Sequence, residues 1–74
     1  PLIKINDSDI TMKFAKISDC WIKPYSASAT SVLSVASGST VEVLTLTGNA
    51  GTFEVDSSLV DDLRFALNDG LTVV

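Results

Sequence analysis

This chain has almost no means of cross-linking itself, so packing has to hold it together. It contains no histidine, and Cys20 is its only cysteine, so it can form no internal disulfide. A structural zinc site, which takes about four Cys or His ligands, is excluded for the same reason. Yet 46% of the 74 residues are apolar, and a domain this small hides only about 60% of the surface that its unfolded chain exposes. We therefore expect one small domain, residues 1–74, whose surplus apolar surface is covered by other proteins.

The sequence shows no sign of a membrane or secretory segment. No apolar run approaches the roughly 18 residues that a membrane span requires, and residues 1–4 lack the basic stretch that opens a signal peptide. A single unpaired cysteine is typical of a reducing compartment. We expect a protein that is made in the cytoplasm and has no membrane among its partners.

The net charge of −4 is concentrated in the second part of the chain. Residues 1–25 carry four lysines against three aspartates, whereas residues 26–74 carry one arginine against six acidic residues, a net charge of −5. Acidic surfaces repel phosphate backbones, so the charge argues against a nucleic-acid partner. The same acidic part favours a positively charged protein surface as partner.

Alternating apolar and polar residues predict strands in the first part of the chain. The alternation covers residues 2–6 and 10–17, and the turn formers at residues 6–9 suggest that these two strands form a hairpin. A third strand is expected at residues 20–25. Pro24 belongs near its end, because proline has no N–H to donate to a sheet.

Residues 26–39 are rich in serine and threonine but also contain valine, alanine and leucine. The apolar residues from Val32 to Ala36 could form a short helical stripe, although β-branched residues and serine weaken a helix. The alternatives are a loop, an irregular strand laid over a partner, or a low-complexity linker. The pattern does not decide among them.

The clearest local pattern runs from residue 40 to residue 55. Strands at 40–47 and 52–55 flank the sequence Gly48-Asn49-Ala50-Gly51, which predicts a tight hairpin turn. Val41 and Val43 are out of phase with the apolar residues that follow them. Either a β-bulge resets the phase near Val43, or another element or another chain covers these two valines.

A helix is expected at residues 58–69, followed by a short strand at 71–74. Ser58 can cap the helix, two aspartates suit its first turn, and Gly70 suits its end. Its apolar stripe consists of Leu59, Val60, Leu63, Ala66 and Leu67. The predicted fold class is therefore α+β, a small antiparallel sheet or barrel-like domain of five or six strands with one C-terminal helix. A chain of this length leaves no room for a repeat of solenoid size.

The side chains that catalysis needs are not found in a usable arrangement. Without histidine, a serine nucleophile would need a lysine as its base, and all four lysines precede residue 24 on expected strand faces. Asp61 and Asp62 are neighbours on the expected helix, so they point about 100° apart and cannot share a substrate. We expect no enzyme and no catalytic residue.

Cofactor and metal sites are not indicated either. The turn around Asp7 and Asp9 lacks the glycine and the distal glutamate of a calcium loop. The glycine-rich turn at residues 48–51 is not followed by the lysine and the helix of a phosphate-binding loop. Cys20, next to Trp21, has no basic neighbour to activate its thiol. We expect no cofactor and no metal.

Five apolar or aromatic residues are candidates for contacts with a partner: Phe65, Trp21, Tyr25, Val41 and Val43. Phe65 lies off the expected helical stripe, where it can anchor in a partner's pocket or contact a folded-back loop. Trp21 and Tyr25 could stack on bases around Lys23, but the acidic remainder of the chain favours a role in a core or an interface. These residues predict a non-enzymatic structural or interaction protein that works as a subunit of a larger assembly.

Three features set the general style of the chain: the Ser/Thr/Val/Ala-rich stretch at residues 26–47, the Gly-Asn-Ala-Gly turn and the N-terminal Pro1. In these features it resembles the small, acidic, cysteine-poor, β-rich proteins of tailed bacteriophage particles, such as capsid decoration or cement proteins. The resemblance implies a virion protein that binds a major capsid protein in many copies, as a homo-oligomer and without catalysis.

Two other functions remain open. A small acidic intracellular inhibitor or antitoxin would bind a basic partner, and its binding would weaken steeply with salt. An accessory subunit of an intracellular enzyme would co-purify with that enzyme rather than with viral particles.

Overall fold

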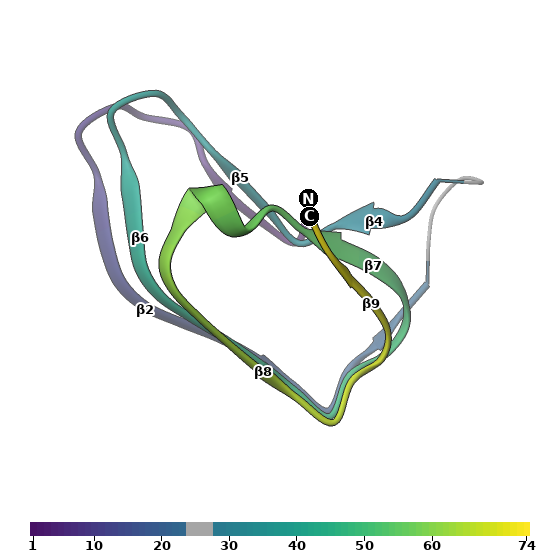
Figure 1. Cartoon of the computed structure of the whole chain (residues 1–74). Coiled ribbons are helices and arrows are strands. Elements are labelled where there is room, and N and C mark those ends of the chain that lie inside the picture. Colours follow the sequence, from purple (N-terminus) through teal and green to yellow (C-terminus); the bar gives the residue numbers. More distant parts are fainter. Residues whose placement is uncertain (24–27) are drawn as a thin grey trace.

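A computed structural model describes residues 1–23 and 28–74, which form nine strands and one turn of 3-10 helix. The elements in chain order are β1 (Ile3–Ile5), β2 (Thr11–Ser18), β3 (Trp21–Ile22), β4 (Thr30–Ser31), β5 (Leu33–Val35), β6 (Thr40–Thr47), β7 (Ala50–Val55), η1 (Ser57–Leu59), β8 (Val60–Ala66) and β9 (Asp69–Val73). The strands are two to eight residues long, and the chain turns a corner after nearly every one of them (Figure 1).

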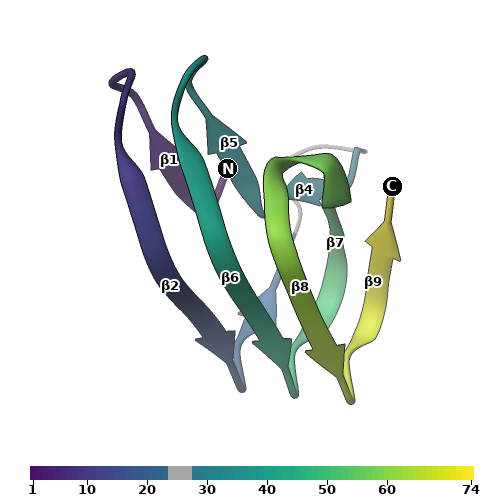
Figure 2. The same ribbon diagram turned by 60° about the vertical axis from the view of Figure 1, so that its left-hand side comes forward.

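All strand pairs among the described residues are parallel. Strand β1 pairs with β5, β2 pairs with β6 and β6 with β8, while β7 pairs with β3, β4 and β9. The chain therefore passes the same three faces in the same order on each circuit. Figure 1 looks along the axis of these circuits, and Figure 2 shows β2, β6 and β8 side by side. The fold is a parallel β-solenoid of three coils.

We call residues 1–32 the first coil, residues 33–56 the second and residues 57–74 the third. Val60 in the third coil lies opposite Val41 in the second, and Thr40 in the second lies opposite Thr11 in the first. The separation between equivalent residues is 19 positions from the second coil to the third, as for the hydrogen-bonded pair Asn49 and Asn68. It is 29 positions from the first coil to the second, as for Cys20 and Asn49. The first coil is thus longer than the second.

The core fills the inside of the coils. Ten apolar residues are buried there: Ile5, Ile22, Val32, Leu33, Val41, Leu44, Leu46, Phe53, Val55 and Val60. Five of them belong to β6 and β7, because the second coil is covered on both sides by its neighbours. Burial of apolar surface is the main stabilising contribution in such a fold.

The predicted α+β class is wrong, because no α-helix occurs among the described residues and residues 58–69 form parts of η1, β8 and β9. The apolar stripe that predicted a helix at residues 58–69 comes instead from the spacing of inward-facing residues in a strand. In β6, Val41 and Leu44 face the core, and Glu42 and Val43 between them are only half-buried. Strand β8 repeats this pattern from Val60 onward. Inward residues three positions apart imitate the period of a helix.

Both predicted hairpins are also wrong, although most of the expected strands are present. Strand β1 pairs with β5 and not with β2, and β6 pairs with β2 and β8 but not with β7. The Gly-Asn-Ala-Gly segment that was expected to reverse the chain instead turns it from one sheet to the next (Figure 1). The expectation that no solenoid repeat fits in this chain fails as well, since the third coil reproduces the second after the short interval given above.

Two open questions from the sequence are answered. The alternation of inward-facing and outward-facing residues in β6 does shift beside Val43: the fully buried residues are Val41, Leu44 and Leu46. Within residues 26–39, the described part contains the strands β4 and β5 and no helix. Pro24 and Tyr25, at the end of the expected strand 20–25, lie outside the described residues.

Candidate functional site

A stack of hydrogen-bonded side chains fixes the corner that follows β2, β6 and β8. Asn49 is only 1% exposed, although it is polar. Its Oδ1 accepts a hydrogen bond from the backbone N–H of Cys20 (3.0 Å), and its Nδ2 donates to the carbonyl oxygen of Ile17 (3.0 Å). Asn68, at the equivalent place one coil later, donates from Nδ2 to the carbonyl oxygen of Leu46 (2.8 Å). Each asparagine therefore ties its coil to the preceding one, and we call Cys20, Asn49 and Asn68 the ladder positions.

One backbone feature of this corner recurs in all three coils. The residue before the ladder position has a positive φ each time: 55° at Asp19, 69° at Gly48 and 59° at Leu67. Further round the corner, a Cβ atom on Gly51 would lie 1.8 Å from the carbonyl oxygen of Ile22. A Cβ atom on Gly70 would likewise lie 1.6 Å from the carbonyl oxygen of Gly51. Only glycine allows the coils to approach this closely here.

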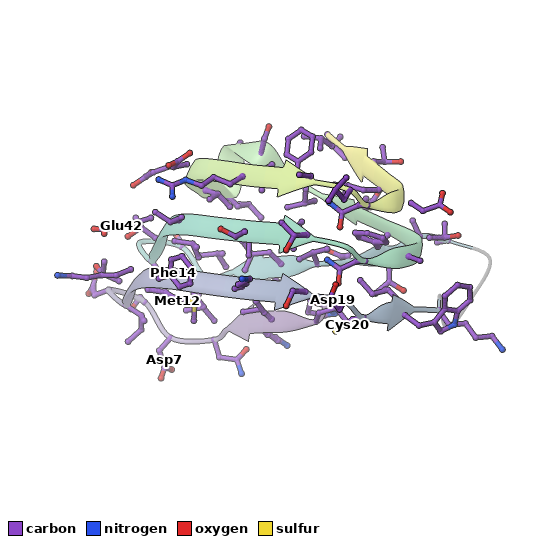
Figure 3. All side chains as sticks on the ribbon, turned by 90° about the horizontal axis from the view of Figure 1, so that it is seen from below. Asp7, Met12, Phe14, Asp19, Cys20 and Glu42 are labelled. Atoms are coloured by element: carbon purple, nitrogen blue, oxygen red, sulfur yellow. The ribbon has the colours of Figure 1, made fainter. Side chains whose placement is uncertain are left out.

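Each end of the solenoid leaves strands with one unpaired edge. Strand β8 pairs with β6 on one side only, and β2 at the opposite end also has β6 as its sole partner. Such edges carry rows of free N–H and C=O groups that can pair with another chain. Figure 3 shows β2 and β8 as the outer strands of this sheet.

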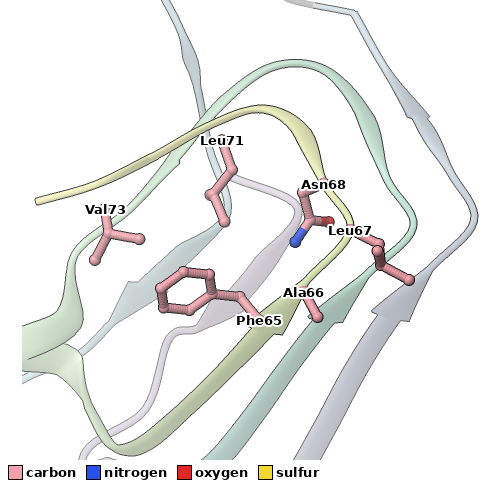
Figure 4. A pocket seen from close by; sticks show the side chains of 6 residues that line it. All are labelled: Phe65, Ala66, Leu67, Asn68, Leu71 and Val73. Carbon is pink, nitrogen blue, oxygen red and sulfur yellow. The ribbon is translucent and has the colours of Figure 1, made fainter.

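The end formed by the third coil, which we call the C-end, is apolar and hollow. Phe65, Leu71 and Val73 line a depression of about 310 Å³ between β8 and β9 (Figure 4). Phe65 is 53% exposed, although the residue opposite it, Leu46, is fully buried. Phe65 thus continues a row of the core into the third coil, where no further coil among the described residues covers it.

The end formed by the first coil, which we call the N-end, has the same character. A depression of about 500 Å³ is lined there by Leu2, Ile3, Lys16, Ile17, Cys20, Trp21, Ile22 and Lys23. Trp21 is 74% exposed. Aromatic side chains of this kind contribute strongly to binding when a partner covers them.

The outer face of the β2–β6–β8 sheet is polar and charged, apart from Phe14 and Val43. Arg64 contacts Asp62 on the same strand, with Nη2 2.8 Å from Oδ2. Both of these side chains are largely exposed, so the pair adds little stability. A further hollow of about 240 Å³ lies where the β5–β6 turn meets η1, and Thr40 and Asp61 at the start of β6 and β8 belong to its lining.

The sequence-based candidates fall into different places in this fold. Phe65 and Trp21 lie at opposite ends of the solenoid, and Val43 is half-buried on the outer face of the sheet. Val41 is fully buried in the core of its own chain. Tyr25 lies outside the described residues. The candidates are thus not brought together in a single site.

Sequence reasoning missed the contributions of Asn49, Asn68, Leu71 and Val73. A signal was present, because the segment from Val41 to Gly51 and the segment from Val60 to Gly70 share valine, leucine, asparagine and glycine at the same intervals. The Asn-x-Gly triplet recurs at the 19-position separation that joins Asn49 to Asn68. A fixed interval of this kind is the sequence signature of a repeat architecture.

Among residues 1–23 and 28–74, no group of three or more acidic or cysteine side chains is placed to hold a metal ion. The same residues contain no helix long and apolar enough to cross a membrane. Comparison with protein-family models, with curated proteins and with solved structures gave no match. The hollow apolar ends of the solenoid are the candidate functional surfaces that the geometry supports best.

Proposed function

We propose that this protein is a non-enzymatic structural subunit that docks onto another protein through the open ends of its solenoid. The observation that carries the proposal is the coincidence of unpaired strand edges and uncovered core residues at the same place. Phe65 and Val73 lie in rows with fully buried residues of the second coil, yet they are exposed. A partner that adds a strand here would satisfy the backbone groups and bury the apolar side chains together.

In its narrower form, the proposal is a virion component of a tailed bacteriophage, such as a capsid decoration protein that binds the major capsid protein. The support for this form is the stylistic resemblance of residues 26–47, the Gly-Asn-Ala-Gly turn and Pro1 to such proteins. A solenoid with two docking ends also suits a protein that is present in many copies and fills gaps between larger subunits. The broader proposal does not depend on the narrower one.

An acidic inhibitor of a basic protein is the second candidate. Glu42, Asp61 and Asp62 lie on one sheet, which favours it, but Lys13 and Lys16 lie on the same sheet. Salt separates the two functions. Docking through apolar ends should weaken much less with added salt than binding that relies mainly on acidic residues, which should weaken steeply.

Amide hydrogen exchange tests the proposal. In the isolated chain, diluted until it is monomeric, amides of β6 and β7 should exchange slowly, and the outward amides of β8 and β9 should exchange fast because they have no partner. In the particle or complex recovered from cells that make the protein, the amides of one or both end coils should become slow. End-coil amides that exchange equally fast in both preparations would contradict the proposal.

A matched pair of variants adds a second readout. Val73→Ser removes apolar surface from the C-end, and Val43→Ser removes it from the outer face of the sheet. Docking should weaken by about tenfold or more for Val73→Ser and stay near the wild-type value for Val43→Ser. Equal losses would show that docking does not use the C-end.

A further inference from the structure

The two ends of the solenoid are complementary to each other, because both continue the same register. Strands β2, β6 and β8 are parallel and pair residue by residue, so that Phe14, Val43 and Asp62 form one row. Adding one more coil after β8 in this register would place a strand equivalent to β2 on its free edge. The first coil of a second copy presents such a strand, with its own outer edge unpaired.

The interior rows remain apolar across such a junction. Ile17, Leu46 and Phe65 form one row, and the next position would be taken by Ile17 of the second copy. In the neighbouring row, Leu63 would meet Ala15 of the second copy. The exposed core residues of both ends would then be buried against each other, which is the main stabilising contribution to association.

Charge complementarity favours this orientation. In the same register, Lys13 and Lys16 of the second copy would flank Asp61 and Asp62 of the first. Lys16 would also face Arg64, but that guanidinium already contacts Asp62 at 2.8 Å. Two N-ends facing each other would bring the lysines of β2 together. In the head-to-tail arrangement these lysines meet aspartates instead, so charge favours it over the pairing of two N-ends.

We propose that the partner at the C-end is the N-end of a second copy of this chain, joined head to tail with β8 pairing to β2 in the register of the existing coils. This inference rests on the proposed docking function and names its partner. A head-to-tail contact joins two different surfaces, so a pair of copies still has one free N-end and one free C-end. Copies therefore associate into open rows that lengthen with concentration instead of stopping at a dimer.

The asparagine ladder suggests a substitution that should strengthen the association of two copies. At the ladder position the first coil has Cys20, which is exposed and has no amide to offer. In the existing coils, an asparagine accepts from the backbone N–H of the coil before it, as Asn49 does from Cys20 (3.0 Å). Cys20→Asn would therefore let the second copy accept from the free backbone N–H of Asn68 and donate to the carbonyl oxygen of Phe65. Two added hydrogen bonds should lower the dissociation constant by about tenfold.

The experiment is sedimentation velocity over a range of concentrations, on the wild type, Cys20→Asn and the control Cys20→Ser. We expect open-ended association, strengthened about tenfold by Cys20→Asn and little changed by Cys20→Ser, which cannot reach across the junction. Association of Cys20→Asn no stronger than that of Cys20→Ser, or a closed dimer that does not grow, would overturn the proposal.

A charge exchange checks the register independently. Lys13→Glu and Asp61→Lys should each weaken association, and the double variant should restore it toward the wild-type value. A double variant that is weaker than either single variant would overturn the proposed register. If the isolated chain stays monomeric while its C-end amides become slow in the recovered complex, self-association fails and the docking function stands. If those amides stay fast in the complex, the docking function itself fails.

Discussion

Asn68 accepts two hydrogen bonds from Asn49, one from the backbone N–H (3.1 Å) and one from the side-chain Nδ2 (3.0 Å). Asn49 in turn accepts from the backbone of Cys20 in the coil before it. A buried amide is costly when its donors and acceptors are left without partners. Here every buried polar side-chain atom among the described residues has a partner. The ladder therefore fixes how one coil stacks on the next, which apolar burial alone would not specify.

Replacing Asn49 by alanine should destabilise the fold strongly. The change leaves the N–H of Cys20 and the carbonyl oxygen of Ile17 without their partners, and we expect a loss of about 2–3 kcal/mol. Urea denaturation monitored by circular dichroism measures it. Asn6→Ala, on an exposed asparagine, is the control and should change stability by less than about 0.5 kcal/mol. Similar losses for both variants would show that the ladder contributes little.

Gly51→Ala should be among the most damaging single changes in the chain. Its φ is 138°, and the added Cβ would lie 1.8 Å from the carbonyl oxygen of Ile22, so two backbones would have to separate. We expect a loss of about 3 kcal/mol or more. Gly38→Ala is the matched control, since its φ of 85° is also positive but its Cβ would meet no atom nearer than the Asp9 side chain at 3.3 Å. A thermal midpoint for Gly51→Ala equal to that of Gly38→Ala would contradict the close approach.

Leu67 is a position where a substitution should stabilise the fold. It adopts a φ of 59° and is 91% exposed, whereas the second coil has glycine at the equivalent position. Leu67→Asn should stabilise the fold by about 1 kcal/mol, because asparagine tolerates this conformation better than leucine. Leu67→Val should have the opposite sign, because a β-branched residue tolerates it worse. Chemical denaturation of the two variants checks both signs, and two shifts in the same direction would refute the explanation.

The pH dependence of stability should contain a contribution from Asp56. The side-chain hydrogen bond from Ser58, and then its backbone N–H, lower the pKa of this carboxyl below the ordinary value of 3.8. A lowered pKa in the folded state means that the contribution is present above about pH 4 and is lost as the pH falls below 3.8 toward the folded-state pKa.

The test for Asp56 compares the wild type with Asp56→Asn, which cannot titrate. The wild type should be the more stable protein at neutral pH, and the difference in urea midpoint should shrink as the solution is acidified below pH 3.8. Asp7→Asn, at an exposed aspartate in another turn, serves as the control. A difference between wild type and Asp56→Asn that grows on acidification would contradict the sign.

Much of the strand content could be predicted from the sequence, but the way the strands pair could not. The expected strand at 40–47 coincides with β6, and those at 2–6 and 10–17 overlap β1 and β2. Alternation identifies an extended segment because side chains point to opposite faces. It does not say whether the partner is the next strand or one that lies a whole coil away in the sequence. Short turns with glycine and asparagine suggested hairpins, although they form corners here.

The helix error and the incomplete picture of the site have a common origin. Val60 and Leu63 face inward with two outward residues between them, and a local reading of this spacing favours a helix. Only the comparison of β8 with β6, strand against strand, reveals the coil. Phe65 and Trp21 could be picked out as large apolar residues without an obvious place in the core, but their position at opposite ends depends on the long-range pairing.

The 19-position interval between the second and third coils allows the stack of coils to grow in whole turns. Each further turn of the same kind would extend it by one strand spacing, about 4.8 Å, while its triangular cross-section stayed the same. Duplication of a single short stretch of coding sequence would therefore produce a longer molecule with an unchanged N-end and C-end. A protein built in this way can match a gap of a given size by adding or losing turns.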